Sequence, residues 1–186
     1  MISPFSFYFV RHGETDWNRI SVYQGPNDIP LNAKGRQQAH ALGKKIKPHN
    51  FKKIYASPLL RALETAEILR SYMSPQSQIF PVEGFKECRS PQSARRVLEL
   101  SGVSKMPSFQ QLREKDETPE QFFEKTTTAL EHTLSDCEEG PPLIVAHGGI
   151  SVAICKALNL PYFRAKNCCF IHFENYGHQC LFPVHE

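Results

Sequence analysis

The sequence predicts an α/β fold, a three-layer α/β/α sandwich built around a mainly parallel sheet. Short apolar runs typical of buried strands alternate with longer segments of helical periodicity, and this alternation favours parallel strands with helices on both faces of the sheet. The 186 residues suit one domain, 1–186. Hydrophobic residues make up 40% of the chain, which is enough to form a core.

Several segments are short, apolar or aromatic, and bounded by turn residues, as buried strands usually are. They are residues 5–10, 53–56, 79–82, 143–146, 170–173 and 179–182. The last two flank the turn sequence ENYGH, so we expect them to be two final strands on either side of a turn.

The helices are predicted from caps and from apolar residues spaced three or four apart. Asn32 suits the N-cap of a helix that stops at Pro48, and residues 118–121 (TPEQ) form a capping box that begins another helix. Ser57 as N-cap, with Pro58 at the first helical position, predicts a helix directly after the second strand. Two further helices are expected at residues 94–100 and 150–157.

Charge and composition exclude several classes of partner. The net charge of +3 comes from 22 basic and 19 acidic residues spread along the chain, so we expect no nucleic-acid surface. The N-terminus has no basic leader and no apolar run near the roughly 18 residues of a membrane helix, so we expect no membrane insertion. The six cysteines include no C-x-x-C pair, which fits reduced thiols and a cytoplasmic protein. The sequence carries no signal for oligomeric state.

Polar residues follow three of the predicted strands at the point where each strand ends. Residues 11–13 (RHG), 57–61 (SPLLR) and 147–149 (HGG) occupy these positions. Ligands bind outside the carboxyl ends of strands in open α/β sheets, so two arginines and two histidines should meet at one edge. Arginine suits phosphate oxygens, helix N-termini attract anions, and Gly13 would let the backbone approach a ligand. The sequence therefore predicts a phosphate site.

The motifs VRHGET, WN, QG..D.PLNAKG..QA, SPLLRALETA and LIVAHGG occur in this order from Val10 to Gly149. Together they resemble the histidine phosphatase superfamily, also called phosphoglycerate mutase-like, in the branch with the extended RHGE block. By that resemblance His12 is the nucleophile that becomes phosphohistidine and Glu87 is the proton-donating acid. The resemblance further implies a third catalytic residue, phosphate-binding residues and substrate-binding residues: His147; Arg11, Asn18, Arg61 and Gly148; Gln24 and Gly25.

The chemistry agrees with these roles. A nucleophilic histidine must be neutral, and nearby Arg11, Arg61 and a protonated His147 would disfavour protonation of His12. The same cations would stabilise charge on the transferring group, so no metal or other cofactor is required. Glu87 would protonate the leaving alcohol and later activate water.

Two parts of this interpretation have rivals. In the family the acid is usually followed by a glycine and an aromatic-acidic-glycine pattern, whereas Glu87 is followed by CRSPQSARR, so Glu83 competes as the acid. His12-Gly13-Glu14 spells H-x-E, but the P-C-x-x-C of zinc deaminases is missing. A metallohydrolase would need a helical H-x-x-x-H pair or a carboxylate-rich cluster, and neither is present in the sequence.

The predicted function is a phosphatase that hydrolyses a phosphomonoester through a covalent phosphohistidine. The expected substrate is a small phosphorylated molecule, and a phosphoprotein is the alternative. Residues 84–117 are expected to determine substrate specificity. One alternative is phosphoglycerate mutase-type transfer; the segment after the acid matches the mutases poorly, although Arg89, Arg95 and Arg96 could contribute. The other alternative is a phosphate- or phosphoprotein-binding module without catalysis.

Overall fold

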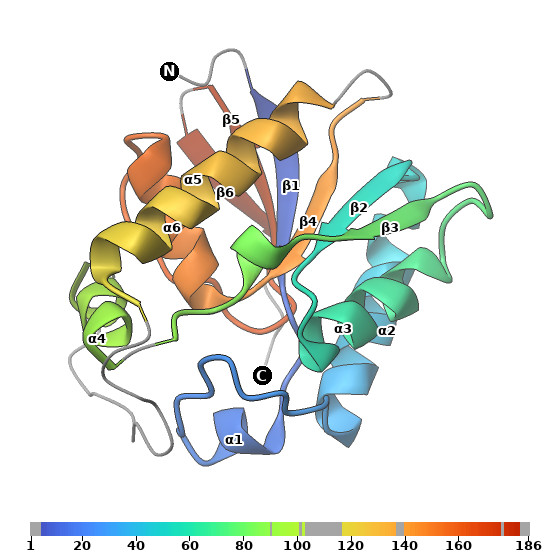
Figure 1. Ribbon diagram of the computed structural model, residues 1–186. Coiled ribbons are helices and arrows are strands. Elements are labelled where there is room, and N and C mark those ends of the chain that lie inside the picture. Colours follow the sequence, from blue (N-terminus) through green and yellow to red (C-terminus); the bar gives the residue numbers. More distant parts are fainter. Residues whose placement is uncertain are drawn as a thin grey trace.

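The computed structural model describes residues 5–89, 91–100, 102, 117–136, 140–175 and 177–182. Its sheet has the strand order β3-β2-β4-β1-β5-β6 (Figure 1). The strands are β1 (Ser6–Arg11), β2 (Lys53–Ala56), β3 (Gln78–Pro81), β4 (Leu143–Ala146), β5 (Phe170–Glu174) and β6 (Gly177–Phe182). The four strands from β3 to β1 pair in parallel, and β5 is antiparallel to both of its neighbours. The predicted mainly parallel sheet is confirmed.

Helices cover both faces of this sheet. They are α1 (Asp16–Arg19), α2 (Ala33–Ile46), α3 (Leu60–Arg70), α4 (Pro91–Leu100), α5 (Pro119–Ser135) and α6 (Gly148–Ala157), with short 3₁₀ turns η1 (Lys47–His49) and η2 (Glu83–Phe85). Helices α2 and α3 pack together on one face, and α5 and α6 on the other, where α4 contacts both (Figure 1). The three-layer α/β/α arrangement is therefore confirmed.

Strand β4 shows how the sequence builds two cores. Leu143 and Val145 pack in the cluster with α2 and α3, whereas Ile144 and Ala146 pack in the cluster with α5 and α6. All four residues are buried, as expected of a central parallel strand that is covered on both faces. The polar groups that follow β4 are thus held by rigid, buried backbone.

Two of the three predicted N-caps are confirmed. The Asn32 side chain accepts a hydrogen bond from a backbone N–H of α2, and residues 118–121 form the capping box of α5. The prediction for Ser57 is wrong: α3 begins at Leu60, with Leu59 as an N-cap that makes no side-chain hydrogen bond. Ser57 is fully buried, and its Oγ shares a 2.7 Å hydrogen bond with His147 Nε2 and accepts a long one from Leu59 N–H at 3.4 Å. Its hydroxyl therefore contacts the residue that follows β4 and the N-cap of α3, and does not cap the helix itself.

Five of the cysteines lie in the described residues and are free thiols, with Cys169 and Cys180 in contact across β5 and β6. Cys137 lies outside the described residues, as does most of the segment 101–116. No helix within the described part of the chain is both long enough and apolar enough to span a bilayer.

Candidate active site

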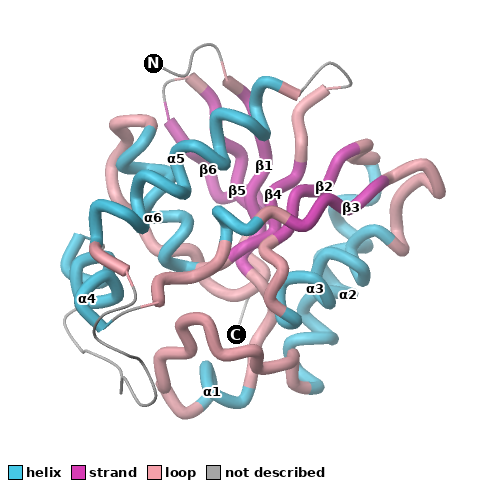
Figure 2. The backbone as a smooth tube through the Cα atoms, viewed as in Figure 1, coloured by secondary structure: helices cyan, strands magenta, loops and turns pink. Residues whose placement is uncertain are grey.

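The carboxyl ends of β1, β2 and β4 lie side by side. The sheet register pairs Arg11 with Ala146, and the backbone N–H of His12 donates to the Ala146 carbonyl at 2.9 Å. On the other side of β4, Ser57 N–H donates to the Val145 carbonyl at 2.9 Å. Figure 2 shows α1 and its flanking loops beneath these strand ends. The residues that follow these three strands therefore meet at one edge of the sheet, as the sequence predicted.

A narrow cleft opens at this edge. It is lined by Arg11, His12, Asn18, Val22, Tyr23, Gln24, Gly25, Arg61, Glu87 and Arg164. His147 is fully buried next to it, with its ring centroid 5.2 Å from that of His12. Gly148 begins α6, and a Cβ atom there would lie 2.8 Å from Arg164 Nε. Every site residue predicted from the sequence thus lies at the cleft or directly beside it.

The His12 ring is oriented for attack from one nitrogen. Its Nδ1 lies 2.7 Å from the Gly13 carbonyl oxygen, which can only accept, so Nδ1 carries the proton and Nε2 has the free lone pair in the neutral ring. Burial, and then Arg61 and Arg11, hold the pKa of His12 well below its usual value; the bond to Gly13 opposes this only in part. His12 is therefore a neutral imidazole at pH 7.

Arg61 fixes the wall of the cleft through two hydrogen bonds while its Nε donor stays free of partners in the described residues. It is 1% exposed, and its Nη1 and Nη2 donate to the carbonyls of Asn27 and Gly25 at 2.7 and 2.8 Å. Arg11 Nη1 donates to the Ala165 carbonyl at 2.9 Å. The Nε atoms of both arginines are buried and have no hydrogen-bond partner in the described residues. Burial is the main cause that lowers the pKa of Arg11 to about 9 and of Arg61 to about 10, so both stay charged at pH 7.

His147 is neutral as well, so the expectation that it is protonated is wrong. Burial lowers its pKa well below the usual value, and Arg61, His12 and Arg11 lower it further. Its Nε2 bonds to Ser57, whereas its Nδ1 is buried without a partner in the described residues. A bound anion is the kind of neighbour that would favour the protonated ring.

The structure brings Glu87, and not Glu83, to the cleft. Glu87 is 5% exposed, and its Oε2 accepts a hydrogen bond from Gly149 N–H at 3.0 Å. Its Oε1 accepts from the N–H of Cys88 at 3.0 Å. The Glu83 side chain is 73% exposed and pairs with Lys86 Nζ at 2.8 Å, outside the cleft lining.

One N–H group at each of the two predicted anion-binding helix N-termini already has a carboxylate partner. Gly149 N–H in the first turn of α6 donates to Glu87, and Leu60 N–H at the start of α3 donates to Asp28 Oδ1 at 2.6 Å. These two N–H groups are therefore not available to a bound anion. Gly13 also differs from the prediction: its N–H donates to Thr65 Oγ1 at 3.1 Å, and its missing side chain permits close packing on α2.

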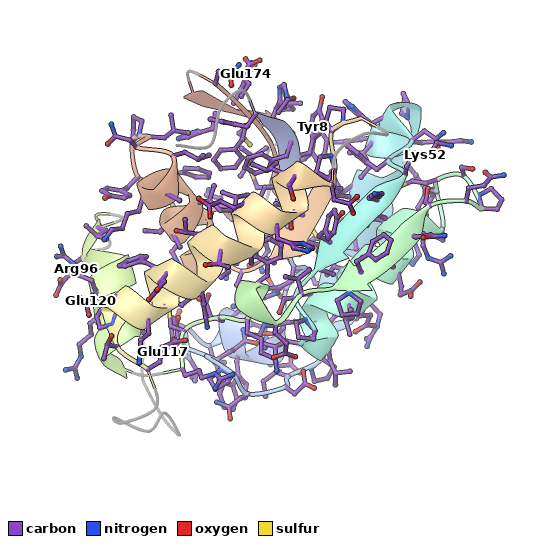
Figure 3. The ribbon with its side chains drawn as sticks, turned by 45° about the horizontal axis from the view of Figure 1, so that its top comes forward. Tyr8, Lys52, Arg96, Glu117, Glu120 and Glu174 are labelled. Atoms are coloured by element: carbon purple, nitrogen blue, oxygen red, sulfur yellow. The ribbon has the colours of Figure 1, made fainter. Side chains whose placement is uncertain are left out.

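The segment that carries Glu87 is tied to α5 through Glu117. Arg89 N–H donates to Glu117 Oε2 at 2.9 Å, and Lys125 Nζ of α5 binds Glu117 Oε1 at 2.6 Å. In Figure 3, Glu117 lies where α5 begins, close to Glu120 and to helix α4. Since Glu117 is also buried, this ion pair fixes the acid segment to α5.

The loop that follows β1 forms the opposite wall. Asn18 lies in α1, a helix not predicted from the sequence, and its Oδ1 accepts from Thr15 N–H at 3.2 Å and from Asn167 Nδ2 at 3.3 Å. Gln24 is 6% exposed, and its Oε1 has no partner in the described residues. Gly25 has φ 52°, a conformation that favours glycine.

Sequence reasoning missed contributors from the loop between α6 and β5. Arg164 lines the cleft, and Asn167 Nδ2 donates to the His12 carbonyl at 2.8 Å. Neither residue belongs to a motif or directly follows a predicted strand, so only the fold brings them here. Within the described residues, no three His, Cys, Asp or Glu side chains are grouped so that they could hold a metal ion.

Comparison with known proteins agrees with this geometry. The chain is 33% identical over 170 residues to the uncharacterized phosphatase PhoE of Bacillus subtilis strain 168, covering 89% of this chain and 86% of that protein. It is 31% identical over 173 residues to the probable phosphoglycerate mutase GpmB of Salmonella arizonae, covering 87% and 80%. The phosphoserine phosphatase of Entamoeba histolytica, solved with 3-phosphoglyceric acid, shares the fold with a TM-score of 0.70 at 24% identity, covering 90% and 89%. The family model of the histidine phosphatase superfamily (branch 1) matches residues 7–183, and this chain belongs to that superfamily.

Proposed function

We propose that this protein is a metal-independent phosphatase that hydrolyses a phosphomonoester through a covalent phosphohistidine at His12. The observation that carries the proposal is a group of buried polar atoms at the cleft that have no partner in the described part of the chain, among them Arg11 Nε, Arg61 Nε and His147 Nδ1. A buried donor without an acceptor costs free energy. A phosphoryl group supplies several anionic oxygens, which accept from both Nε donors, and from His147 Nδ1 in the tautomer whose Nε2 accepts from the Ser57 hydroxyl.

Each residue then has a step in the reaction. His12 Nε2 attacks phosphorus, and the P–O bond to the leaving alcohol breaks as Glu87, in its acid form, gives that oxygen a proton. Arg11 and Arg61 stabilise charge on the equatorial oxygens, in the place that a metal takes in other phosphotransferases. Water then attacks the phosphohistidine while the Glu87 carboxylate takes its proton, which restores both side chains.

The site itself favours hydrolysis over mutase-type transfer. A mutase must also grip a second anionic group, for which Arg89, Arg95 and Arg96 were the candidates. None of the three is among the residues that line the cleft, and Arg96 faces Glu99 at 3.6 Å in an exposed pair. The relatives carry both names, phosphatase and probable phosphoglycerate mutase, so activity has to separate them.

The test is release of inorganic phosphate from p-nitrophenyl phosphate and from a panel of small phosphomonoesters, a phosphopeptide included. We expect turnover that withstands EDTA, is inhibited by vanadate, and is abolished in His12→Ala. His132→Ala, which changes an exposed histidine on α5, is the matched control. Loss with EDTA and recovery with zinc would contradict the metal-free mechanism; transfer between positions of a phosphoglycerate without net release would indicate a mutase, and phosphate binding without turnover a binding module.

The substrate is taken to be a small molecule in the cytoplasm. The described residues that line the cleft leave only a narrow opening, so we propose a small phosphorylated compound as the substrate; the phosphopeptide in the panel tests the alternative. Cell fractionation tests the compartment.

A further inference from the structure

Two cysteines of the last two strands are in contact. Cys169 lies directly before β5 and Cys180 lies in β6, and their Sγ atoms are 2.6 Å apart. Both are free thiols. Cys180 is paired with Ile171, and Ile171 and Cys169 pack in the same core cluster, on the sheet face that carries α5 and α6. Two thiols that meet on one face of a hairpin are the reactants of a disulfide.

The neighbouring thiol of Cys168 does not belong to this pair. Its side chain packs in the core cluster with α2 and α3, whereas that of Cys169 packs in the cluster with α5 and α6. Cys168 also has φ 52°, a conformation that is uncommon for a residue with a side chain. The two adjacent side chains therefore point to opposite faces of the sheet, and Cys169 is the one that meets Cys180.

The two thiols of the pair differ in accessibility. Cys180 is exposed, whereas the other four cysteines of the described residues are buried. Burial is the main cause that raises the pKa of Cys169, and its hydrogen bond with Cys180 raises it further, so Cys169 keeps its proton at pH 7. A reagent in solution therefore reaches Cys180 first. An accessible thiol with a second thiol beside it is the usual arrangement of redox-sensitive cysteines.

We propose that Cys169 and Cys180 are an oxidation site, which hydroperoxides convert to an intrachain disulfide in the folded protein. The Cys180 thiolate attacks a peroxide oxygen, the O–O bond breaks, and the leaving oxygen takes up a proton, which gives a sulfenic acid at Cys180. The Cys169 sulfur then attacks the sulfenic sulfur, the S–O bond breaks, and water leaves with the proton of Cys169. The two thiols lose two electrons, which reduce one hydroperoxide. A dithiol reductant reverses the reaction by exchange.

This disulfide would tie β6 to a segment that holds two residues of the cleft. Cys168 N–H donates to the Arg11 carbonyl at 2.9 Å, and Asn167 Nδ2 donates to the His12 carbonyl at 2.8 Å. Cys169 follows directly in the chain. Because an S–S bond is about 2.05 Å long, the sulfur atoms need to move by only about half an ångström. Oxidation should therefore lock this segment in its present conformation and leave the cleft intact.

The test treats the folded, fully reduced protein with a small excess of hydrogen peroxide and measures its intact mass. We expect wild type to lose the mass of two hydrogen atoms without forming a dimer, and dithiothreitol to reverse the loss. Chymotrypsin cleaves after aromatic residues, and Phe170 and Phe173 lie between the two cysteines. Two chymotryptic peptides that stay joined until they are reduced therefore identify the bond.

The variants separate the pair from its neighbour. Cys169→Ser and Cys180→Ser should both abolish the loss of two hydrogen atoms. Cys168→Ser is the matched control: it removes the adjacent thiol on the opposite face, and the disulfide should still form. In Cys169→Ser the sulfenic acid at Cys180 has no second thiol to react with, so dimedone, a reagent for sulfenic acids, should label Cys180 there and not in wild type.

The oxidised protein should differ from the reduced one in stability and not in activity. Its melting temperature should be higher by about 4 °C or more, since a disulfide that fits the native structure restricts the unfolded chain. Its kcat/KM for p-nitrophenyl phosphate should stay within about twofold of the reduced value, because the residues of the cleft do not move.

The proposal is overturned if folded wild type does not lose the two hydrogen atoms, if the loss persists in Cys169→Ser, or if the new bond joins two chains. A melting temperature that does not rise on oxidation, or a loss of activity of about tenfold or more, would show that the bond needs a rearranged segment and would also overturn it. The inference does not depend on the reaction at His12. If the reduced protein hydrolysed no phosphomonoester, the proposed function would fail alone, and mass and melting would still decide the oxidation site.

Discussion

The Glu87 carboxylate accepts a hydrogen bond from the backbone N–H of Gly149 at 3.0 Å, across 62 positions of sequence. The first turn of α6 therefore holds the Glu87 side chain, at a helix terminus that favours its carboxylate form. The contact is close because Gly149 has no side chain: a Cβ atom there would overlap Glu87 Oε1. A mutation of this glycine should act on the acid while leaving the rest of the site in place.

Gly149→Ala should lower kcat/KM for alkyl phosphates by roughly tenfold or more, because the Glu87 carboxylate must move from its place in the cleft. The fold should survive, since the displaced atoms are the end of a flexible side chain. Gly177→Ala is the control, because a Cβ atom there would meet nothing within 4 Å. Steady-state kinetics and thermal melting report both effects. Unchanged activity would show that Glu87 does not depend on this contact.

Arg61→Lys should be costly although it keeps the charge. Lysine cannot reproduce the two bonds to the carbonyls of Gly25 and Asn27 and still present a donor to phosphate. We expect kcat/KM to fall by about tenfold or more, about 1.4 kcal/mol in the barrier. Arg70→Lys, at an exposed pair with Glu67 on the same helix, should stay within about twofold. Similar values for the two variants would contradict a role of Arg61 in phosphate binding.

The sequence predicted the site residues that follow strands. His12, Arg61 and His147 come after short apolar runs, and the register of parallel strands brings such positions together whatever their distance in sequence. The same local reasoning failed where a side chain had a tertiary partner. Ser57 looks like an N-cap, but its hydroxyl bonds to His147, which is fixed by β4.

For a related reason, the sequence could not predict that Arg164 lies in the cleft or that Glu87 binds the N-terminus of α6. Arg164 lies in an irregular loop, and its place in the cleft depends on where that loop passes the end of β1. Free N–H groups at the N-terminus are a property of any helix, but the bond from Gly149 N–H to Glu87 depends on a segment more than sixty positions away. Both outcomes follow from long-range packing, which neither periodicity nor motifs encode.

The free energy of unfolding should decrease as the pH is lowered, and the size of this decrease reports the lowered pKa of His12. Above about pH 6.5 both the native and the unfolded protein keep this ring neutral, so His12 makes no difference. Below that value the unfolded chain takes up a proton that the native state refuses, because burial and the neighbouring arginines hold the native pKa down. Each such histidine removes about 1.4 kcal/mol of unfolding free energy per pH unit, until the native pKa is reached.

His12→Asn should therefore lose less stability than wild type between pH 6.5 and pH 5.5. Denaturant unfolding in phosphate-free buffer measures the difference, since bound phosphate would favour the protonated ring. Equal losses in the two proteins would mean that His12 titrates normally in the native state, and the neutral nucleophile would have to be abandoned.

The assignment of Glu87 as the acid can be tested by changing the leaving group. An alkyl alcohol needs a proton as its P–O bond breaks, whereas p-nitrophenolate leaves readily without one. Glu87→Gln keeps the size and polarity of the side chain but cannot deliver that proton. It should lower kcat/KM by roughly 10²–10³-fold on alkyl phosphates, the range of a positioned general acid, and much less on p-nitrophenyl phosphate. Because kcat/KM covers the reaction only through the first irreversible step, it isolates phosphorylation of His12 from the later hydrolysis.

Glu83→Gln is the matched control: its exposed carboxylate pairs with Lys86, so both substrates should react as in wild type. Equal losses on both substrates in Glu87→Gln would mean that Glu87 positions or binds without donating, and a leaving-group dependence in Glu83→Gln would move the acid there.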